Sequence, residues 1–185
     1  LRKNFSKSDL EIRLDANGAF KKNHALEKLK FLSNYSIHSI EQPIEQNQWD
    51  DMAKLCELSP IPIALDEELI GVNLEREALL DTIKPQYLIL KPSLLGGFLE
   101  SDDWINLAEK RKINWWATSA LESNVGLNAI SQWVYTKNNI MKQGLGTGML
   151  FKNNVNSPLE ISSDTIFLNQ NKTWDLNFFL DKIDI

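Results

Sequence analysis

Short apolar runs recur along the chain, and each of them ends in a polar residue. The end residues lie 25 to 28 positions apart, which is close to the combined length of one strand, one helix and two loops. The residues between the runs have helical spacing, as in Ala25, Leu26, Leu29 and Leu32. The pattern therefore predicts repeated βα units, with strands over residues 12–15, 37–41, 61–66, 87–91 and 114–119.

Alternating strands and helices predict an α/β protein with a parallel sheet, which can close as a TIM-type (βα)8 barrel. A sixth strand is expected near Gly144 to Thr147, so that the chain supplies about six of the eight βα units. Residues 152–185, with a strand over 165–168 and a short helix over 174–183, are interpreted as a tail of the same domain. Residues 1–185 are therefore predicted to form one partial barrel.

A closed barrel needs strands that this pattern does not supply. The chain begins without Met, and residues 1–5 resemble the end of a helix, so we expect that an upstream region is missing. Six strands alone would leave two exposed edges. We expect the missing N-terminal region, or a second copy of the chain, to close the barrel.

Composition narrows the possible partners and compartment. The formal net charge is −5, and no segment gathers Lys and Arg into a cluster, so nucleic acid is not expected as a partner. No apolar stretch approaches the roughly 20 residues of a membrane-spanning helix, and no membrane association is expected. Cys56 is the only cysteine, which excludes an intrachain disulfide and favours the cytoplasm.

Candidate chemistry lies where the predicted strands end. Asp15, Glu41 and Asp66 end three successive runs, and Lys91 ends the fourth. One such residue alone is more often a solvated loop residue or a helix cap. Four residues that each end a successive strand would meet at the C-terminal face of a barrel. Three carboxylates need a cation, and hard oxygen ligands favour Mg2+. A lysine facing that site could act as acid or base, or stabilise negative charge.

These strand-end motifs resemble the muconate-lactonising branch of the enolase superfamily. The resemblance covers roughly residues 10–150 and includes Leu14-Asp15-Ala16-Asn17, Ile40-Glu41-Gln42-Pro43, Leu65-Asp66-Glu67, Leu90-Lys91-Pro92-Ser93 and Thr118-Ser119. Within the branch, Ser119-Ala120-Leu121-Glu122-Ser123 and Gly144-Leu145-Gly146-Thr147-Gly148 are most similar to the o-succinylbenzoate synthases of menaquinone biosynthesis.

The resemblance implies a lyase reaction on a small-molecule carboxylate, the Mg2+-dependent dehydration of 2-succinyl-6-hydroxy-2,4-cyclohexadiene-1-carboxylate to 2-succinylbenzoate. It implies that Asp15, Glu41 and Asp66 bind the Mg2+ that stabilises the enediolate, and that Lys91 stabilises the intermediate or acts as a second base. In the family a Lys-x-Lys motif before the first strand seen here supplies the base, and a capping domain covers the barrel. The motif is not found here, so we expect this chain alone to be inactive.

Other residues are assigned weaker roles. The resemblance implies that Asn17 orients Asp15, although an Asn before Gly18 is equally typical of a turn. Ser119, Leu121 and Gly146 are expected to receive the succinyl arm, whereas Gly-rich loops more often serve backbone geometry alone. Glu122 is either a pocket residue or an acid in the first turn of a helix.

Two other functions stay open at this stage. N-acylamino acid racemases and dipeptide epimerases of the superfamily use the same metal site with lysines on both faces. The chain could also be a noncatalytic barrel fragment or interaction module, for which Mg2+ would bring no stabilisation.

Overall fold

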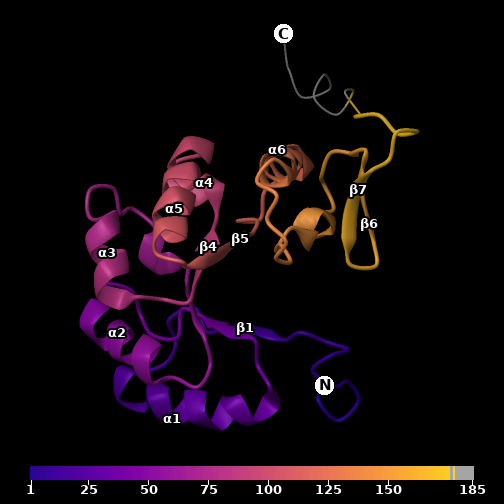
Figure 1. The fold of residues 1–185 in the computed structure, drawn as a ribbon. Coiled ribbons are helices and arrows are strands. Elements are labelled where there is room, and N and C mark those ends of the chain that lie inside the picture. Colours follow the sequence, from indigo (N-terminus) through magenta and orange to yellow (C-terminus); the bar gives the residue numbers. More distant parts are fainter. Residues whose placement is uncertain (176, 178–185) are drawn as a thin grey trace.

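Five short strands form one parallel sheet in a computed structural model that describes residues 1–175 and 177. Their order in the sheet follows their order in the sequence (Figure 1). The strands are β1 (Arg13–Asp15), β2 (Ser39–Glu41), β3 (Ile63–Leu65), β4 (Tyr87–Leu90) and β5 (Asn114–Ala117). All five strands predicted from the apolar runs are confirmed, each within shorter bounds.

Helices alternate with these strands and lie in an arc outside them (Figure 1). The helix α5 begins at Phe98, and within its first turn the Ser101 hydroxyl donates to the Gly97 carbonyl at 2.8 Å. None of the helices described is long and apolar enough to cross a membrane. The helices are α1 (Lys22–Leu32), α2 (Trp49–Leu58), α3 (Arg76–Ile83), α4 (Pro92–Leu95), α5 (Phe98–Lys110) and α6 (Asn124–Tyr135), with 3-10 helices η1 (Ser33–Tyr35), η2 (Glu67–Leu69) and η3 (Gly146–Met149).

The sixth strand expected near Gly144 is reduced to a single parallel bridge between Thr118 and Gly144. The Gly144 amide donates to the Ala117 carbonyl at 2.8 Å, and its own carbonyl accepts the Ser119 amide at 3.1 Å. A Cβ at position 144 would lie 2.5 Å from Thr118 Oγ1, so a side chain would prevent this approach. The chain then turns into η3. The described residues therefore provide five regular strands and one bridge of a barrel that has eight strands when closed.

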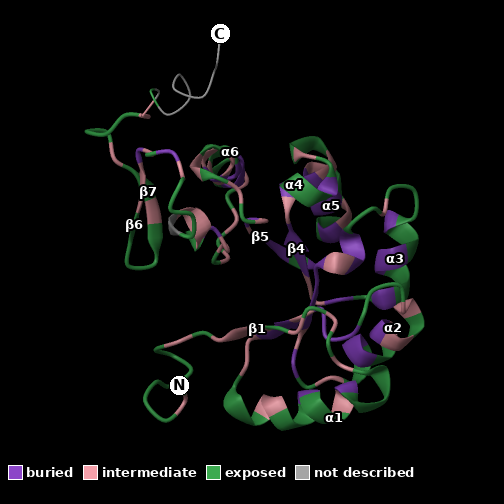
Figure 2. Ribbon diagram, turned by 180° about the vertical axis from the view of Figure 1, so that it is seen from behind, coloured by how far each residue is buried: buried purple, intermediate pink, exposed green. Residues whose placement is uncertain are grey.

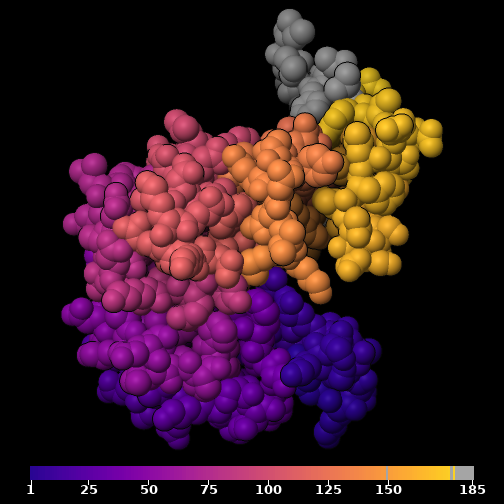
Figure 3. All heavy atoms as spheres, viewed as in Figure 1, coloured from indigo at the N-terminus to yellow at the C-terminus, as the bar shows by residue number. Residues whose placement is uncertain are grey.

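The C-terminal part of the chain forms an antiparallel hairpin of β6 (Leu159–Ser162) and β7 (Thr165–Leu168). The strand predicted over 165–168 is confirmed, and most of the helix predicted over 174–183 lies outside the described residues. The hairpin (yellow) lies beside the orange segment around α6 and η3 in Figure 3. Its connection is held by Asn124, whose side chain donates to the Val155 carbonyl at 2.6 Å.

Alternation along the strands separates two apolar clusters. The larger one contains Leu65, Leu88 and Trp115 together with the buried faces of the helices, as the purple segments of Figure 2 show. The smaller one contains Ala64, Ile89 and Trp116, which lie on the other side of the same strands. Trp115 and Trp116 thus point to opposite sides of their strand. The side that carries Trp116 is the inner face of the partial barrel.

The side chain of Cys56, on the inner side of α2, is buried in this core. Burial raises the pKa of its thiol to about 12, so the reactive thiolate is scarce near neutral pH. We expect 5,5′-dithiobis(2-nitrobenzoic acid) to label the folded protein at least a hundred times more slowly at Cys56 than the protein unfolded in guanidinium. Labelling of Cys56 at equal rates in the two conditions would contradict this packing.

Candidate active site at the strand ends

The four residues predicted from the strand ends lie at one end of the sheet. Asp15 and Glu41 are register partners in β1 and β2, while Asp66 and Lys91 directly follow β3 and β4. Alternation puts all four on the side of Ala64 and Ile89, the inner face. The C-terminal ends of parallel strands thus bring together residues that are far apart in sequence.

Lys91 joins two of the three predicted carboxylate ligands. Its ammonium forms a hydrogen-bonded ion pair with Asp66 and lies 3.6 Å from Glu41 Oε1. Burial alone would lower the pKa of Lys91, but the hydrogen bond and the charges of Asp66 and Glu41 raise it overall. Lys91 is therefore a cation near neutral pH, and it stands between two carboxylates.

Asp15 is turned differently from the other two. It is exposed, and its Oδ1 accepts the backbone amide of Asn17 at 2.8 Å. Asn17 has a φ of +44° and is followed by Gly18 at +72°, so this contact belongs to a turn. Across the part of the chain that the structure describes, no three His, Cys, Asp or Glu side chains stand close enough together to hold a metal ion.

The site nevertheless holds more carboxyl groups than the single ammonium group of Lys91 can pair with. Burial raises the pKa of Glu41 to about 9, helped by a hydrogen bond with Asp66 and by the charges of Asp66 and Asp15. Glu67, the residue after Asp66, also has a raised pKa, first from burial and then from the Asp66 charge. Its Oε2 is buried without a hydrogen-bond partner among the described residues. Several carboxyl oxygens gathered at one point, with pKa values raised by burial and by one another's charges, fit a hard cation such as Mg2+.

Glu67 was missed by the sequence analysis, although its signal was present. It stands next to the predicted ligand Asp66 in the acidic run Asp66-Glu67-Glu68. The first of these residues follows a buried strand, and the other two begin η2, which folds the run back over the strand end. A second acid adjacent to a predicted ligand is therefore a candidate in its own right.

A second group of polar contacts links the loops after β4 and β5. Glu122 accepts hydrogen bonds from the hydroxyls of Ser93 and Ser119, both at 2.5 Å, and from the Ala120 amide at 3.1 Å. The Ser119 hydroxyl in turn accepts the amide of Leu121, which has a φ of +66° and is exposed. Glu122 therefore connects α4, the short helix that follows Lys91, to the loop that carries two of the predicted substrate-binding residues.

Burial would raise the pKa of Glu122, but the hydrogen bonds from Ser119, Ser93 and the backbone lower it overall. A carboxylate with a lowered pKa stabilises the fold above its ordinary pKa of 4.5, and that contribution is lost as the pH falls through its folded-state value. We expect Glu122→Gln to cost roughly 1 kcal/mol near neutral pH, and the difference from wild type to shrink in acid.

Urea unfolding of both proteins across this pH range measures the difference. Glu109→Gln on the exposed face of α5 is the matched control, and it should leave stability unchanged. A Glu122→Gln effect that is the same at every pH would contradict the role given to its charge.

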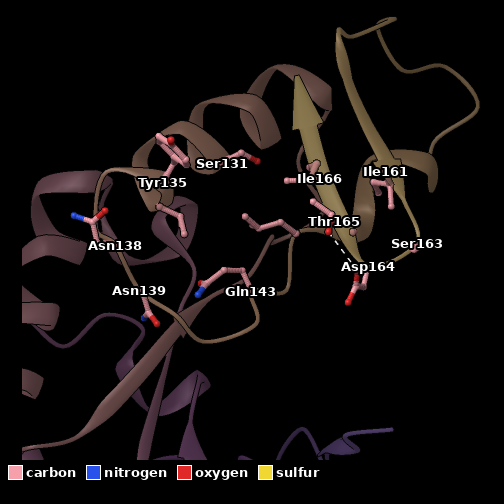
Figure 4. Close-up of a pocket in the computed structure, with 13 residues that line it drawn as sticks. Ser131, Tyr135, Asn138, Asn139, Gln143, Ile161, Ser163, Asp164, Thr165 and Ile166 are labelled. Atoms are coloured by element: carbon pink, nitrogen blue, oxygen red, sulfur yellow. Dashed lines mark hydrogen bonds between the residues drawn. The ribbon is translucent and has the colours of Figure 1, made fainter. Parts of the chain in front are cut away.

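Two cavities lie near the predicted residues. One of about 640 Å3 opens between α6 and the β6–β7 hairpin, where Tyr135, Gln143 and Thr165 line it (Figure 4). It includes Gly146 but none of the strand-end residues. Another of about 540 Å3 lies on the inner face and is lined by Glu41, Trp116 and Thr118. The second cavity is the one that adjoins the acidic cluster.

The fold and the site define the class of protein, an α/β protein of the TIM-barrel type with an acidic cluster at the C-terminal ends of its strands. The family model described as "Enolase C-terminal domain-like" matches residues 1–170, and the chain belongs to this family.

Similar proteins support this assignment. The chain is 58% identical over 162 residues to an o-succinylbenzoate synthase of Desulfotalea psychrophila, over 87% of this chain and 44% of that protein. The crystal structure of MenC from the same organism has a TM-score of 0.87 and 57% identity, over 89% of this chain and 47% of that one. An N-succinylamino acid racemase of Thermus thermophilus is 37% identical over 115 residues, 62% of this chain and 31% of that protein. The chain thus spans less than half the length of each relative.

Proposed function

We propose that this chain forms the larger part of the catalytic barrel of an o-succinylbenzoate synthase. The reaction would remove water from 2-succinyl-6-hydroxy-2,4-cyclohexadiene-1-carboxylate and give 2-succinylbenzoate for menaquinone biosynthesis. The observation that carries the proposal is the meeting of Glu41, Asp66 and Lys91 on the inner face, in a chain 58% identical to a protein with that name.

Asp15, Glu41 and Asp66 are the proposed ligands of Mg2+, which would supply positive charge beside the substrate carboxylate. Binding the metal would require the exposed Asp15 side chain to turn toward Glu41 and Asp66. The excess of carboxylates over ammonium groups supports such a cation, since a hard ion prefers oxygen ligands. Asn17 would fix Asp15 through the backbone amide that Asp15 already accepts.

Lys91 is proposed to stabilise the negative charge that develops when a proton leaves the carbon next to the substrate carboxylate. Its ammonium lies on the inner face beside Glu41 and Asp66, at the end of the sheet where the substrate carboxylate would meet the metal, which supports this role. The base that takes the proton is proposed to be a lysine upstream of Leu1. The same lysine, now protonated, would return that proton to the hydroxyl on the neighbouring carbon as its carbon–oxygen bond breaks, so that water leaves and the ring becomes aromatic.

The loops after β5 are proposed to receive the succinyl arm. Ser119, whose hydroxyl is held by Glu122 and by the Leu121 amide, would shape this loop, and Leu121 presents an exposed apolar side chain that could cover methylene groups. Gly146 begins η3 without a side chain to obstruct the arm. Upstream residues are proposed to pair with β1 and with the Gly144 segment, which are the two edges of the partial barrel. The buried free thiol of Cys56 suits the reducing cytoplasm as the site of the reaction.

The experiment is a side-by-side assay of two reactions by the full-length protein with Mg2+. Dehydration is followed with 2-succinyl-6-hydroxy-2,4-cyclohexadiene-1-carboxylate, and racemisation with N-succinylated amino acids. Dehydration with little racemisation supports the proposal. Racemisation without dehydration would replace it with the second candidate, which the 37% identity to an N-succinylamino acid racemase favours. If the protein catalyses neither reaction and does not bind Mg2+, the result would favour a noncatalytic module.

A further inference from the structure

Two buried polar side chains lie directly behind the predicted ligands. Gln42 follows Glu41 and is 1% exposed, and Glu68 is two residues after Asp66 and is 3% exposed. Burying an amide and a carboxylate costs free energy unless their polar atoms are paired. Their hydrogen bonds therefore decide what these two residues contribute.

Every polar atom of the two side chains has a partner. The Gln42 amide group donates to the Ile44 carbonyl at 3.1 Å and to Glu68 Oε2 at 3.0 Å. The Gln42 side-chain oxygen accepts the backbone amides of Asp66 and Glu68, both at 3.3 Å. Glu68 Oε1 accepts the Asn47 amide at 2.8 Å. The network thus joins the loop after β2 to the loop after β3.

The backbone at this junction is held in an uncommon conformation. Gln42 has a φ of +36°, which costs free energy for a residue with a side chain. The Gln42 backbone amide still donates to the Ala64 carbonyl at 3.0 Å, so the pairing of β2 with β3 continues past Glu41. The side-chain network offsets the strain and fixes the point at which each strand ends.

We propose that Gln42 and Glu68 are positioning residues that fix the separation of Glu41 and Asp66. Gln42 binds the amide of Asp66 while it is itself covalently joined to Glu41, so one side chain sets the spacing of both carboxylates. The effect on a cation rests on the proposed function. Loss of residues that orient metal ligands typically lowers metal affinity by about 10- to 100-fold.

The test compares Gln42→Met and Glu68→Gln in the full-length protein. Gln42→Met keeps a long side chain and removes its hydrogen bonds. Glu68→Gln keeps the shape and puts a donor where an acceptor is needed. Glu109→Gln, the same change at an exposed site of α5, is the matched control.

The first readout is amide hydrogen exchange without metal. Gln42→Met should speed exchange at Asp66 and Glu68 by about tenfold or more, while the Leu88 amide in the centre of the sheet keeps its rate. A merely structural role would speed exchange at Leu88 as well. The second readout is Mn2+ affinity by titration calorimetry, which should fall by about 10- to 100-fold in both variants and not in Glu109→Gln.

Unchanged Asp66 exchange and unchanged Mn2+ affinity in folded variants would overturn the inference. If Gln42→Met does not fold, the exchange rates and the Mn2+ affinity of Glu68→Gln test the proposal instead. If the wild-type protein binds no Mn2+, the proposed metal site fails, and the exchange rates alone then decide whether these residues position the strand ends.

Discussion

Replacing Lys91 with methionine is expected to lower kcat for dehydration by about 100- to 1000-fold in the full-length protein, with a much smaller effect on KM. This is the loss typical of removing one preorganised group that stabilises developing negative charge. The Lys91 ammonium is held in place by Asp66 and Glu41, so it needs no rearrangement when that charge appears.

The control for this variant is Lys54→Met on α2. Lys54 is exposed and lies 3.6 Å from Asp51 in a surface ion pair, of a kind worth about 0–1 kcal/mol. Its kcat should stay unchanged. If Lys91→Met folds, binds Mg2+ and retains kcat within a factor of three, Lys91 does not act on the reacting atoms.

Replacing Trp104 with alanine is expected to lower the free energy of unfolding by about 3–5 kcal/mol. Trp104 is fully buried on the face of α5 that packs into the larger cluster, and the Arg76 guanidinium lies 5.4 Å from its ring. Its removal leaves a large cavity that the rigid sheet cannot fill.

Guanidinium unfolding measures this loss, and Leu99→Ala on the same helix is the control. Leu99 is 74% exposed, so its truncation should change stability by no more than about 0.5 kcal/mol. A loss below about 1 kcal/mol for Trp104→Ala would mean that α5 does not pack as described.

Most of the fold could be predicted because burial on both sides of a parallel sheet leaves a strong signal. β3 and β4 are runs of apolar residues, and each ends just before a residue of the site, Asp66 or Lys91. The sixth strand was predicted wrongly as a regular strand. Glycine at 144 and 146 suits a strand or a loop equally well, and the close contact of Gly144 with Thr118 depends on tertiary structure.

The site was predicted as a set of positions, and its side-chain arrangement was not. The regular spacing of the repeats predicted Lys91 at the end of its strand, but the ion pairs with Asp66 and Glu41 depend on how the inner face packs. Asp15 is exposed and accepts the Asn17 amide in a turn where Asn17 has a positive φ, a conformation that sequence alone leaves open. Gln42 and Glu68 escaped notice because an amide and an acid after a strand are also typical of ordinary loops.

The measurement that tests the central claim most directly is dehydration by the full-length protein before and after removal of divalent cations. If the strand-end cluster is a Mg2+-dependent active site, turnover is lost in excess EDTA and returns when Mg2+ is added. Turnover that continues at its full rate in EDTA would contradict a catalytic role for a metal held by Asp15, Glu41 and Asp66.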